Sequence, residues 1–438
     1  MASGTRTRSR GRTRAQGSAA PRPGPAQRPS APSPLHFRTR SGQGGAFRLQ
    51  RLVLVEVAFA VLLVGWAIGP VALVPAAAVA VCLVLLSFVR RRGRSLPEWL
   101  ATARALRARQ RRAASTQLPP GTEPGFAPAV ECDPSLRTYT YGSRDRRPVG
   151  MVGDGTFVTA VLLVEAGATA LRAERSRQPL PLALVHDALE VDGIRLESAQ
   201  IVLHTQPAPA IHLPQQSVAV ANYAPLHEQT GAPAVRITWI ALKLDPELCP
   251  EAVAARGGGL LGAQKCVLRA ADHLASRLTG SGFRTTVLDE EELISAIATS
   301  ACANPLVTAE AGRTEVRERR TEESGRSWRC DNRRHTTYWV RRWPALGGER
   351  APSLPQFLAL VTAVPALATT FSLTLARGER QEVSVSGHLR VTGRSDDELV
   401  AARRALQTAA RHTGAGLARL DREQLPGMLA TLPLGGAR

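Results

Sequence analysis

Cysteine is scarce in this 438-residue sequence, and lysine is scarcer still, with only Lys243 and Lys265. The six cysteines form no CxxC pair and have no histidine at metal-ligand spacing, so we expect free thiols in a reducing compartment. The histidines include no HExxH motif, and no serine lies in a GxSxG turn. We therefore expect no catalytic residues, no metal site, no cofactor and no enzymatic activity.

A phosphate-binding loop is also missing. Residues 256–265 read Arg-Gly-Gly-Gly-Leu-Leu-Gly-Ala-Gln-Lys, but Cys266 follows the lysine where the GxxxxGK[ST] motif needs serine or threonine. Glycines before a helix also serve as ordinary loop and cap residues. We favour that interpretation and keep nucleotide binding at this loop as the weaker alternative.

Acidic residues are absent from positions 1–51, which carry eleven arginines. Residues 1–114 hold +18 of the formal net charge of +20, so residues 115–438 are nearly neutral. A domain that binds duplex DNA presents a concentrated basic face, and a nearly balanced domain offers none. We therefore expect no nucleic-acid partner for the main domain and assign the basic charge to a membrane surface.

Large apolar residues are nearly absent from residues 1–48, which we expect to be a disordered Arg/Pro-rich tail. Residues 49–90 then contain two apolar runs, 52–68 and 71–89, separated only by Gly69 and Pro70. Each run is long enough to span a membrane as a helix, which predicts a two-helix transmembrane hairpin. Because arginines flank both runs and the turn is uncharged, we expect both termini and the main domain in the cytoplasm.

Residues 91–114 are expected to form a basic amphipathic helix below the membrane, with a linker at 115–129. Its apolar stripe can lie in the lipid interface while its arginines bind anionic lipid or an acidic partner surface. The residues predicted to contact membrane or partner are Arg90, Arg91, Arg92, Arg94, Trp99, Arg104, Arg107, Arg111 and Arg112.

The remaining sequence shows the same order of strands and helices twice, at residues 130–305 and 335–438. The fold class expected is α/β (α+β) with an internal duplication. The most specific match pairs Asp289 and Glu292 with Asp421 and Gln424, which predicts a helix cap in each copy. Residues 306–334 mix both charge signs and are expected to form a solvated linker.

The twin apolar runs, the segment from Arg94 to Leu100 (Arg-Ser-Leu-Pro-Glu-Trp-Leu) and much of the C-terminal domain resemble the EccE family of actinobacterial type VII (ESX) secretion systems. Further similar stretches are residues 239–246, 254–259, 338–344 and 420–427. The resemblance implies a non-catalytic structural subunit of a membrane secretion complex. It also implies EccB, the EccC ATPase, EccD and the mycosin protease as partners.

Two other function classes stay open at this stage. One is a membrane-anchored transferase of glycosyltransferase-like fold, using the loop at Gly257 to Gly262 and acids such as Asp245. The other is a membrane-tethered protein that binds nucleic acid through its basic tail. Deleting the tail would separate the last class, because only a tail-dependent activity would then vanish.

Overall fold

The computed structural model describes residues 42–88, 90–91, 94–142, 147–166, 179–206, 235–313, 318–345, 353–377 and 383–436. Most of the predicted disordered tail, residues 1–41, lies outside this part of the chain. The predicted apolar runs lie in two helices, α1 (Gly42–Ile68) and α2 (Pro70–Phe88), which meet at Gly69 with φ +132°. A short pair of strands, β1 (Arg90–Arg91) and β2 (Arg94–Ser95), precedes helix α3 (Leu96–Ser115).

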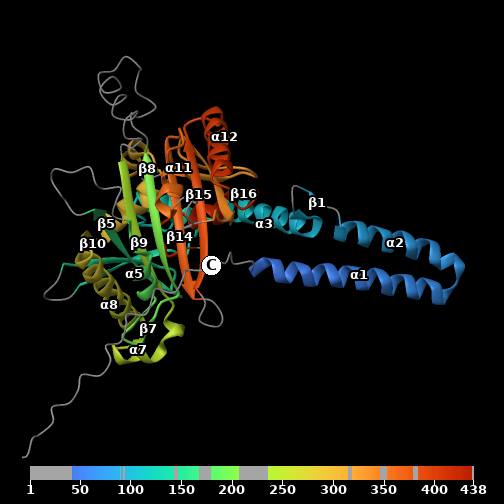
Figure 1. The fold of residues 1–438 in the computed structure, drawn as a ribbon, viewed down its shortest axis with the longest axis horizontal. Coiled ribbons are helices and arrows are strands. Elements are labelled where there is room, and N and C mark those ends of the chain that lie inside the picture. Colours follow the sequence, from blue (N-terminus) through green and yellow to red (C-terminus); the bar gives the residue numbers. More distant parts are fainter. Residues whose placement is uncertain are drawn as a thin grey trace, which may run out of the picture. The chain divides into compact units, whose positions relative to one another are not determined.

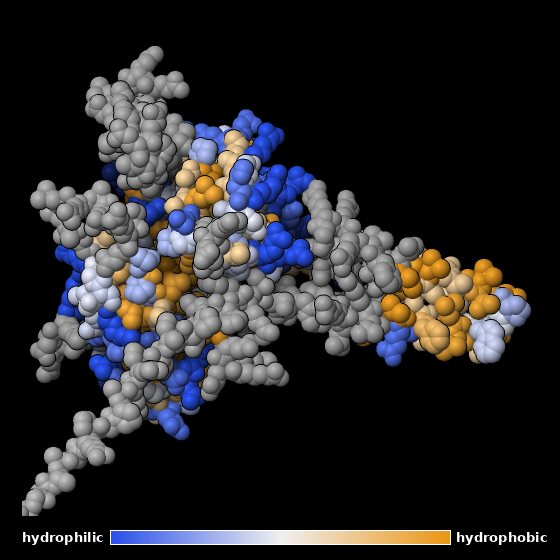
Figure 2. All heavy atoms as spheres, in the orientation of Figure 1, coloured by the Kyte–Doolittle hydropathy of each residue, from blue (hydrophilic) through white to orange (hydrophobic). Residues whose placement is uncertain are grey.

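The two N-terminal helices pack closely on each other. A Cβ atom on Gly65 would lie 2.4 Å from the Cβ of Ala76, so glycine is required at this crossing. Many of their described apolar side chains are exposed, Trp66 at 74% and Val71 at 87% among them, and Figure 2 shows such residues gathered on this hairpin. Within the described residues, no helix combines the length and apolarity of a candidate membrane span.

A twelve-stranded sheet with antiparallel pairing throughout forms the centre of the domain (Figure 1). The first half of the chain contributes β3 (Arg137–Tyr141), β4 (Val149–Gly153), β5 (Val158–Ala166), β8 (Ser198–Gln206), β9 (Val235–Leu244) and β10 (Phe283–Val287). The second half contributes β11 (Thr321–Glu323), β12 (Trp328–Cys330), β13 (Arg333–Arg342), β14 (Ala368–Arg377), β15 (Val383–Gly393) and β16 (Gly416–Arg419). The large antiparallel sheet confirms the mixed α/β class.

The two halves repeat one pairing order. In the first half β9 lies between β8 and β5, and the outer edge of β5 is shared by β4 and β10. In the second half β15 lies between β14 and β13, and the outer edge of β13 is shared by β12 and β16. The halves join where β8 pairs with β14, from Thr205 opposite Thr369 to Ser198 opposite Ala376.

Helices cover both faces of this sheet. One core cluster joins one sheet face to α5 (Leu182–Asp187), α7 (Pro250–Ala255), α8 (Gly259–Gly280), α11 (Leu354–Thr362) and α12 (Asp396–His412). A second cluster joins the other face to α4 (Ala127–Cys132), α9 (Glu290–Ser300) and α13 (Gln424–Leu429). The alternation of strand residues between these clusters follows from the two-residue period of a β-strand. The remaining short elements are β6 (Glu190–Val191), β7 (Ile194–Arg195), the 3-10 helix η2 (Pro246–Leu248) and α10 (Pro305–Ala311).

The predicted helix caps have different outcomes in the two halves. Asp289 caps α9 by accepting from the amide of Glu292, and its own amide donates to the Glu292 carboxylate, as expected. The prediction for Asp421 is wrong, because its carboxylate pairs with Arg419 and the cap position of α13 is Glu423. Gln424 instead accepts from the amide of Thr337, which fastens α13 to β13.

The described parts of the expected solvated linker at 306–334, residues 306–313 and 318–334, are structured. They include β11 and β12, which extend the sheet beyond β13. Trp328 is 1% exposed and Arg320 is 9% exposed, so the segment contributes to the core. The many charged residues of this segment resemble those of a solvated linker in sequence. Several of them pair with one another within the fold.

Candidate functional site

Helix α3 is attached to the domain by an arginine that was not among the predicted contacts. The Arg109 guanidinium lies 2.7 Å and 2.9 Å from the two carboxylate oxygens of Glu323 on β11, and it also donates to the carbonyl of Arg422. Gln110 donates to the backbone carbonyl of Glu323. The Glu323 side chain is 4% exposed and also accepts from the amide of Leu425. One buried carboxylate therefore joins α3, β11 and the start of α13.

Two further contacts hold the ends of α3. The guanidinium of Arg422 lies 4.2 Å from the ring of Trp99, in a cation–π contact near the first turn. Arg319 donates to the carbonyl of Ala113 in the last turn and to the carbonyl of Glu131 in α4. Because these contacts lie more than two helical turns apart, they fix the side of α3 that faces the domain.

The predicted contact residues of α3 are thereby divided between two sides. Arg104, Arg107, Arg111 and Arg112 are exposed, and we call these four residues the α3 arginine surface. Trp99 is half-buried against Arg422, and Leu106 is 9% exposed. Arg92 and the side chains of Arg90, Arg91 and Arg94 lie outside the described residues. Trp99 and Leu106 thus face the domain, while Leu100 is 40% exposed and the outward side of α3 presents guanidinium groups.

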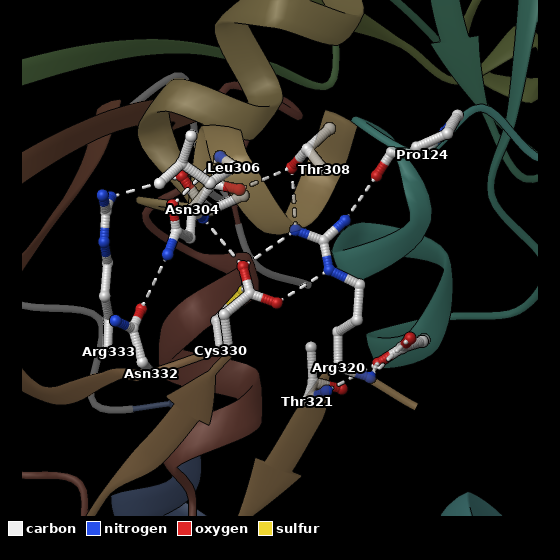
Figure 3. A network of polar contacts seen from close by, with 12 residues as sticks. Pro124, Asn304, Leu306, Thr308, Arg320, Thr321, Cys330, Asn332 and Arg333 are labelled. Atoms are coloured by element: carbon white, nitrogen blue, oxygen red, sulfur yellow. Dashed lines mark hydrogen bonds and ion pairs between the residues drawn. The ribbon is translucent and has the colours of Figure 1, made fainter. Parts of the chain in front are cut away.

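A buried ion pair supports the strand to which α3 is attached (Figure 3). Arg320 binds Asp331 through two contacts, of 2.7 Å and 2.8 Å, and it also donates to the carbonyl of Pro124 and the hydroxyl of Thr308. Both side chains are at most 7% exposed. Burial lowers the pKa of Arg320, but the bound Asp331 carboxylate more than offsets this and leaves that pKa above its ordinary value. The guanidinium is therefore charged.

The same network reaches α4 through Glu131. Its buried carboxylate accepts from the amides of Arg320 and Thr321 at 2.7–3.1 Å. The Asp331 carboxylate accepts from the amide of Asn304 at the start of α10. These bonds connect the β11–β12 hairpin, which carries Glu323, to α4 and to the start of α10.

The glycine loop at Gly257 has the geometry of a helix entry. Gly257, Gly258 and Gly259 all have positive φ, and Lys265 donates to the carbonyl of Arg256. In the part of the chain that the structure describes, no cluster of three metal-ligating side chains occurs. Asp245, the acid considered for a transferase, accepts from the amide of Glu247 and caps η2.

Two buried histidines lie on the α13 side of the sheet. His204 and His335 are fully buried, and each contacts a threonine hydroxyl through Nδ1 at 3.0 Å, Thr370 and Thr392 respectively. Burial, aided by the nearby Arg390 guanidinium, lowers the pKa of His204 to about 3 and that of His335 well below its ordinary value. Both rings are neutral at neutral pH and act as packed polar residues.

One sequence pattern indicates that α3 is attached to the domain. Trp99, Leu106, Arg109 and Ala113 follow the three- and four-residue spacing of a single helix side. Arg109 therefore falls on the apolar side, where an arginine needs a buried partner. The partner, Glu323, lies 214 residues away in the sequence, and no residue pattern near Arg109 identifies it.

One segment of the chain is similar to a known protein family. Residues 232–340 match the model of the family described as type VII ESX secretion system translocon, EccE. The matched segment runs from before β9 into β13 and includes Arg320, Glu323 and Asp331. A search of curated proteins found no significant match.

Proposed function

We propose, from the match of residues 232–340 to the EccE model, that the chain belongs to this secretion-system family and is a non-catalytic structural subunit of a type VII secretion complex. Its partners would be the other membrane subunits, namely EccB, the EccC ATPase, EccD and the mycosin protease. This proposal extends the sequence resemblance and the family match. The non-catalytic role rests on the missing nucleophile, metal and phosphate-loop motifs.

The membrane anchor in this proposal is the α1–α2 hairpin. The exposed apolar side chains of Trp66, Ile68, Val71 and Val74 favour an apolar environment for its tip. The close crossing of Gly65 and Ala76 is typical of helices that pack through small residues in lipid. The basic residues on both sides of the hairpin favour a cytoplasmic location for both termini and for the main domain.

The proposed attachment point is the α3 arginine surface. The observation that carries this step is the way α3 is fixed, with Arg109 and Trp99 turned to the domain and Arg104, Arg107, Arg111 and Arg112 exposed. With Trp99, Leu106 and Arg109 engaged by the domain, α3 binds other surfaces mainly through its exposed charge. Anionic lipid headgroups and acidic protein surfaces both suit such a contact, at about 1 kcal/mol per basic residue near anionic lipid.

We also infer that the domain arose by internal duplication. The matching order of β5, β8, β9 and β10 with β13, β14, β15 and β16 supports this inference. Duplication of a unit gives two halves with the same pairing order. If the edge strand of the unit can pair with its own copy, the halves join at equivalent strands, as β8 and β14 do.

The test of the proposed function is the identity of the companions of the chain. The tagged protein would be extracted in mild detergent and its co-purifying proteins identified by mass spectrometry. An FtsK-like ATPase and a multi-spanning membrane protein in stoichiometric amounts support the proposal. Purification of the chain without these companions, from cells in which the secretion complex is assembled, contradicts it.

A further inference from the structure

The C-terminal residues 430–436, here called the strap, lie on the face of the sheet opposite α8 and α12. Thr431 and Leu432 are fully buried, and Leu434 is 6% exposed. The strap contacts Lys243 of β9, Gln200 of β8 and Thr374 of β14. It therefore crosses the line along which the two halves of the sheet meet.

One side chain binds both ends of the strap. The amide of Gln200 accepts from the backbone N–H of Gly435 at 2.8 Å and donates to the carbonyl of Ala430 at 2.9 Å. The same Gln200 nitrogen lies 2.8 Å from the hydroxyl of Ser372, across the junction of β8 and β14. A fully buried glutamine is thus satisfied by main-chain groups of the strap and by a residue of the other half.

Three hydroxyl groups bind the rest of the strap backbone. Ser198 donates to the carbonyl of Gly435 at 2.6 Å, Thr159 to that of Leu434 at 3.1 Å, and Ser300 to that of Thr431 at 3.0 Å. Without the strap these buried polar groups would lose their partners, which is costly for a folded protein. The polar groups of this sheet face therefore bind main-chain atoms of the strap.

The end of the strap admits only glycine. A Cβ on Gly435 would lie 2.5 Å from the Cβ of Lys243, and a Cβ on Gly436 would lie 2.5 Å from the hydroxyl of Thr374. Both residues also have positive φ, +96° and +94°. The aliphatic part of Lys243 forms one wall here, held by its 3.0 Å ion pair with Glu197 and by the Phe157 ring.

We propose that this polar sheet face is a peptide-binding site, occupied here by the chain's own C-terminus, which locks the two halves of the domain together. The class of ligand that fits is a short turn-forming peptide with two apolar residues followed by Gly-Gly. Departure of the strap opens the site to another segment of this class and loosens the β8–β14 junction. This inference goes beyond the proposed function and does not depend on it.

A binding experiment tests the site directly. A fluorescent peptide of residues 430–438 is titrated into the full-length protein and into a variant that ends at Leu429, both in the same detergent. The shortened protein binds the peptide at one site, and the full-length protein, whose site is filled, binds it at least about tenfold more weakly. A peptide carrying Gly435→Ala binds the shortened protein at least about tenfold more weakly, because the added methyl group overlaps Lys243. Equal binding by both proteins, or no binding by a folded shortened protein, overturns the proposal.

Hydrogen exchange on the full-length chain gives a second test that needs no truncation. Gly435→Ala speeds amide exchange in the strap and at the β8–β14 junction by at least about tenfold. The matched control is Gly155→Ala, because Gly155 has nearly the same φ, +92°, but no atom lies within 4 Å of the position that its Cβ would take. Equal protection of the strap in the two variants overturns the proposal, whether or not the shortened protein folds.

Discussion

The guanidinium of Arg109 lies 2.7 Å from the carboxylate of Glu323, although 214 residues separate them. This contact turns the side of α3 that carries Leu106 and Arg109 toward the domain and leaves Arg104, Arg107, Arg111 and Arg112 exposed. Because Glu323 also accepts from the start of α13, the orientation of α3 depends on the edge of the sheet. The exposed charge is therefore presented by a fixed helix.

Loss of this contact should free α3. We expect Arg109→Ala to raise amide exchange in α3 and to lower the free energy of unfolding by about 2 kcal/mol, because it leaves the Glu323 carboxylate buried without its cation. Hydrogen exchange with mass spectrometry and denaturant unfolding measure the two effects. Arg107→Ala, on the exposed side of the same helix, is the control. Similar exchange in the two variants would show that Arg109 does not hold α3.

The buried pair of Arg320 and Asp331 should matter more than an exposed pair on the same hairpin. We expect Arg320→Ala to destabilise the protein by about 3 kcal/mol or more, because Asp331 is left as an unpaired buried charge. Arg329→Ala removes the exposed partner of Glu322 on the same pair of strands and should cost about 0.5 kcal/mol or less. Thermal unfolding compares the two variants. Equal losses would place the stabilisation elsewhere in the fold.

The buried histidines predict a stability that falls in mild acid. The pKa of His204 is lowered to about 3 and that of His335 is also lowered, while an unfolded histidine titrates near 6.5. Below pH 6.5 the unfolded chain therefore binds protons that the folded chain refuses, so the free energy of unfolding decreases as the pH falls. The expected slope is about 1 kcal/mol per pH unit for each histidine.

Denaturant unfolding between pH 7 and pH 4.5 measures this dependence. His204→Gln should make the slope shallower, because it removes one group whose pKa is lowered on folding. An unaltered slope in the His204 variant would mean that other groups control the loss of stability in acid.

Much of the fold follows from local sequence patterns. The sequence predicts a strand at residues 235–244, which coincides with β9, and a helix at 354–361, which falls within α11. Hydrophobic periodicity and helix-end signals identify such elements, as with Ser353 before α11 and Asp289 before α9. The pairing of β8 with β14 has no such signal, because it joins residues more than 160 positions apart.

The main errors share one physical cause, which is that buried polar residues resemble exposed ones in sequence. Arg320 and Asp331 lie among charged neighbours, so their segment resembles a solvated linker until the fold brings them together. Asp421 occupies the expected cap position, but a nearby partner, Arg419, takes its carboxylate. The arginine surface was predicted from composition, whereas the inward role of Arg109 depends on Glu323 in a distant strand.

The membrane topology is predicted from the basic residues on both sides of the α1–α2 hairpin. A reporter inserted between Gly69 and Pro70 should be active on the outer side of the membrane, and a reporter fused after Arg438 should be active on the cytoplasmic side. Fusions to alkaline phosphatase and to a fluorescent protein distinguish the two locations. Phosphatase activity at the C-terminus would contradict the proposed topology.

The most direct test of the account is whether the α3 arginine surface attaches the subunit to its complex. The variant carries Arg104→Glu, Arg107→Glu, Arg111→Glu and Arg112→Glu, and the tagged protein is purified in mild detergent beside the unaltered chain. We predict that the variant stays in the membrane fraction but loses the co-purifying FtsK-like ATPase and its associated membrane subunits, and that raised salt releases the unaltered chain in the same way. Co-purification that neither treatment reduces would contradict the account and would assign attachment to the hairpin or to another face of the domain.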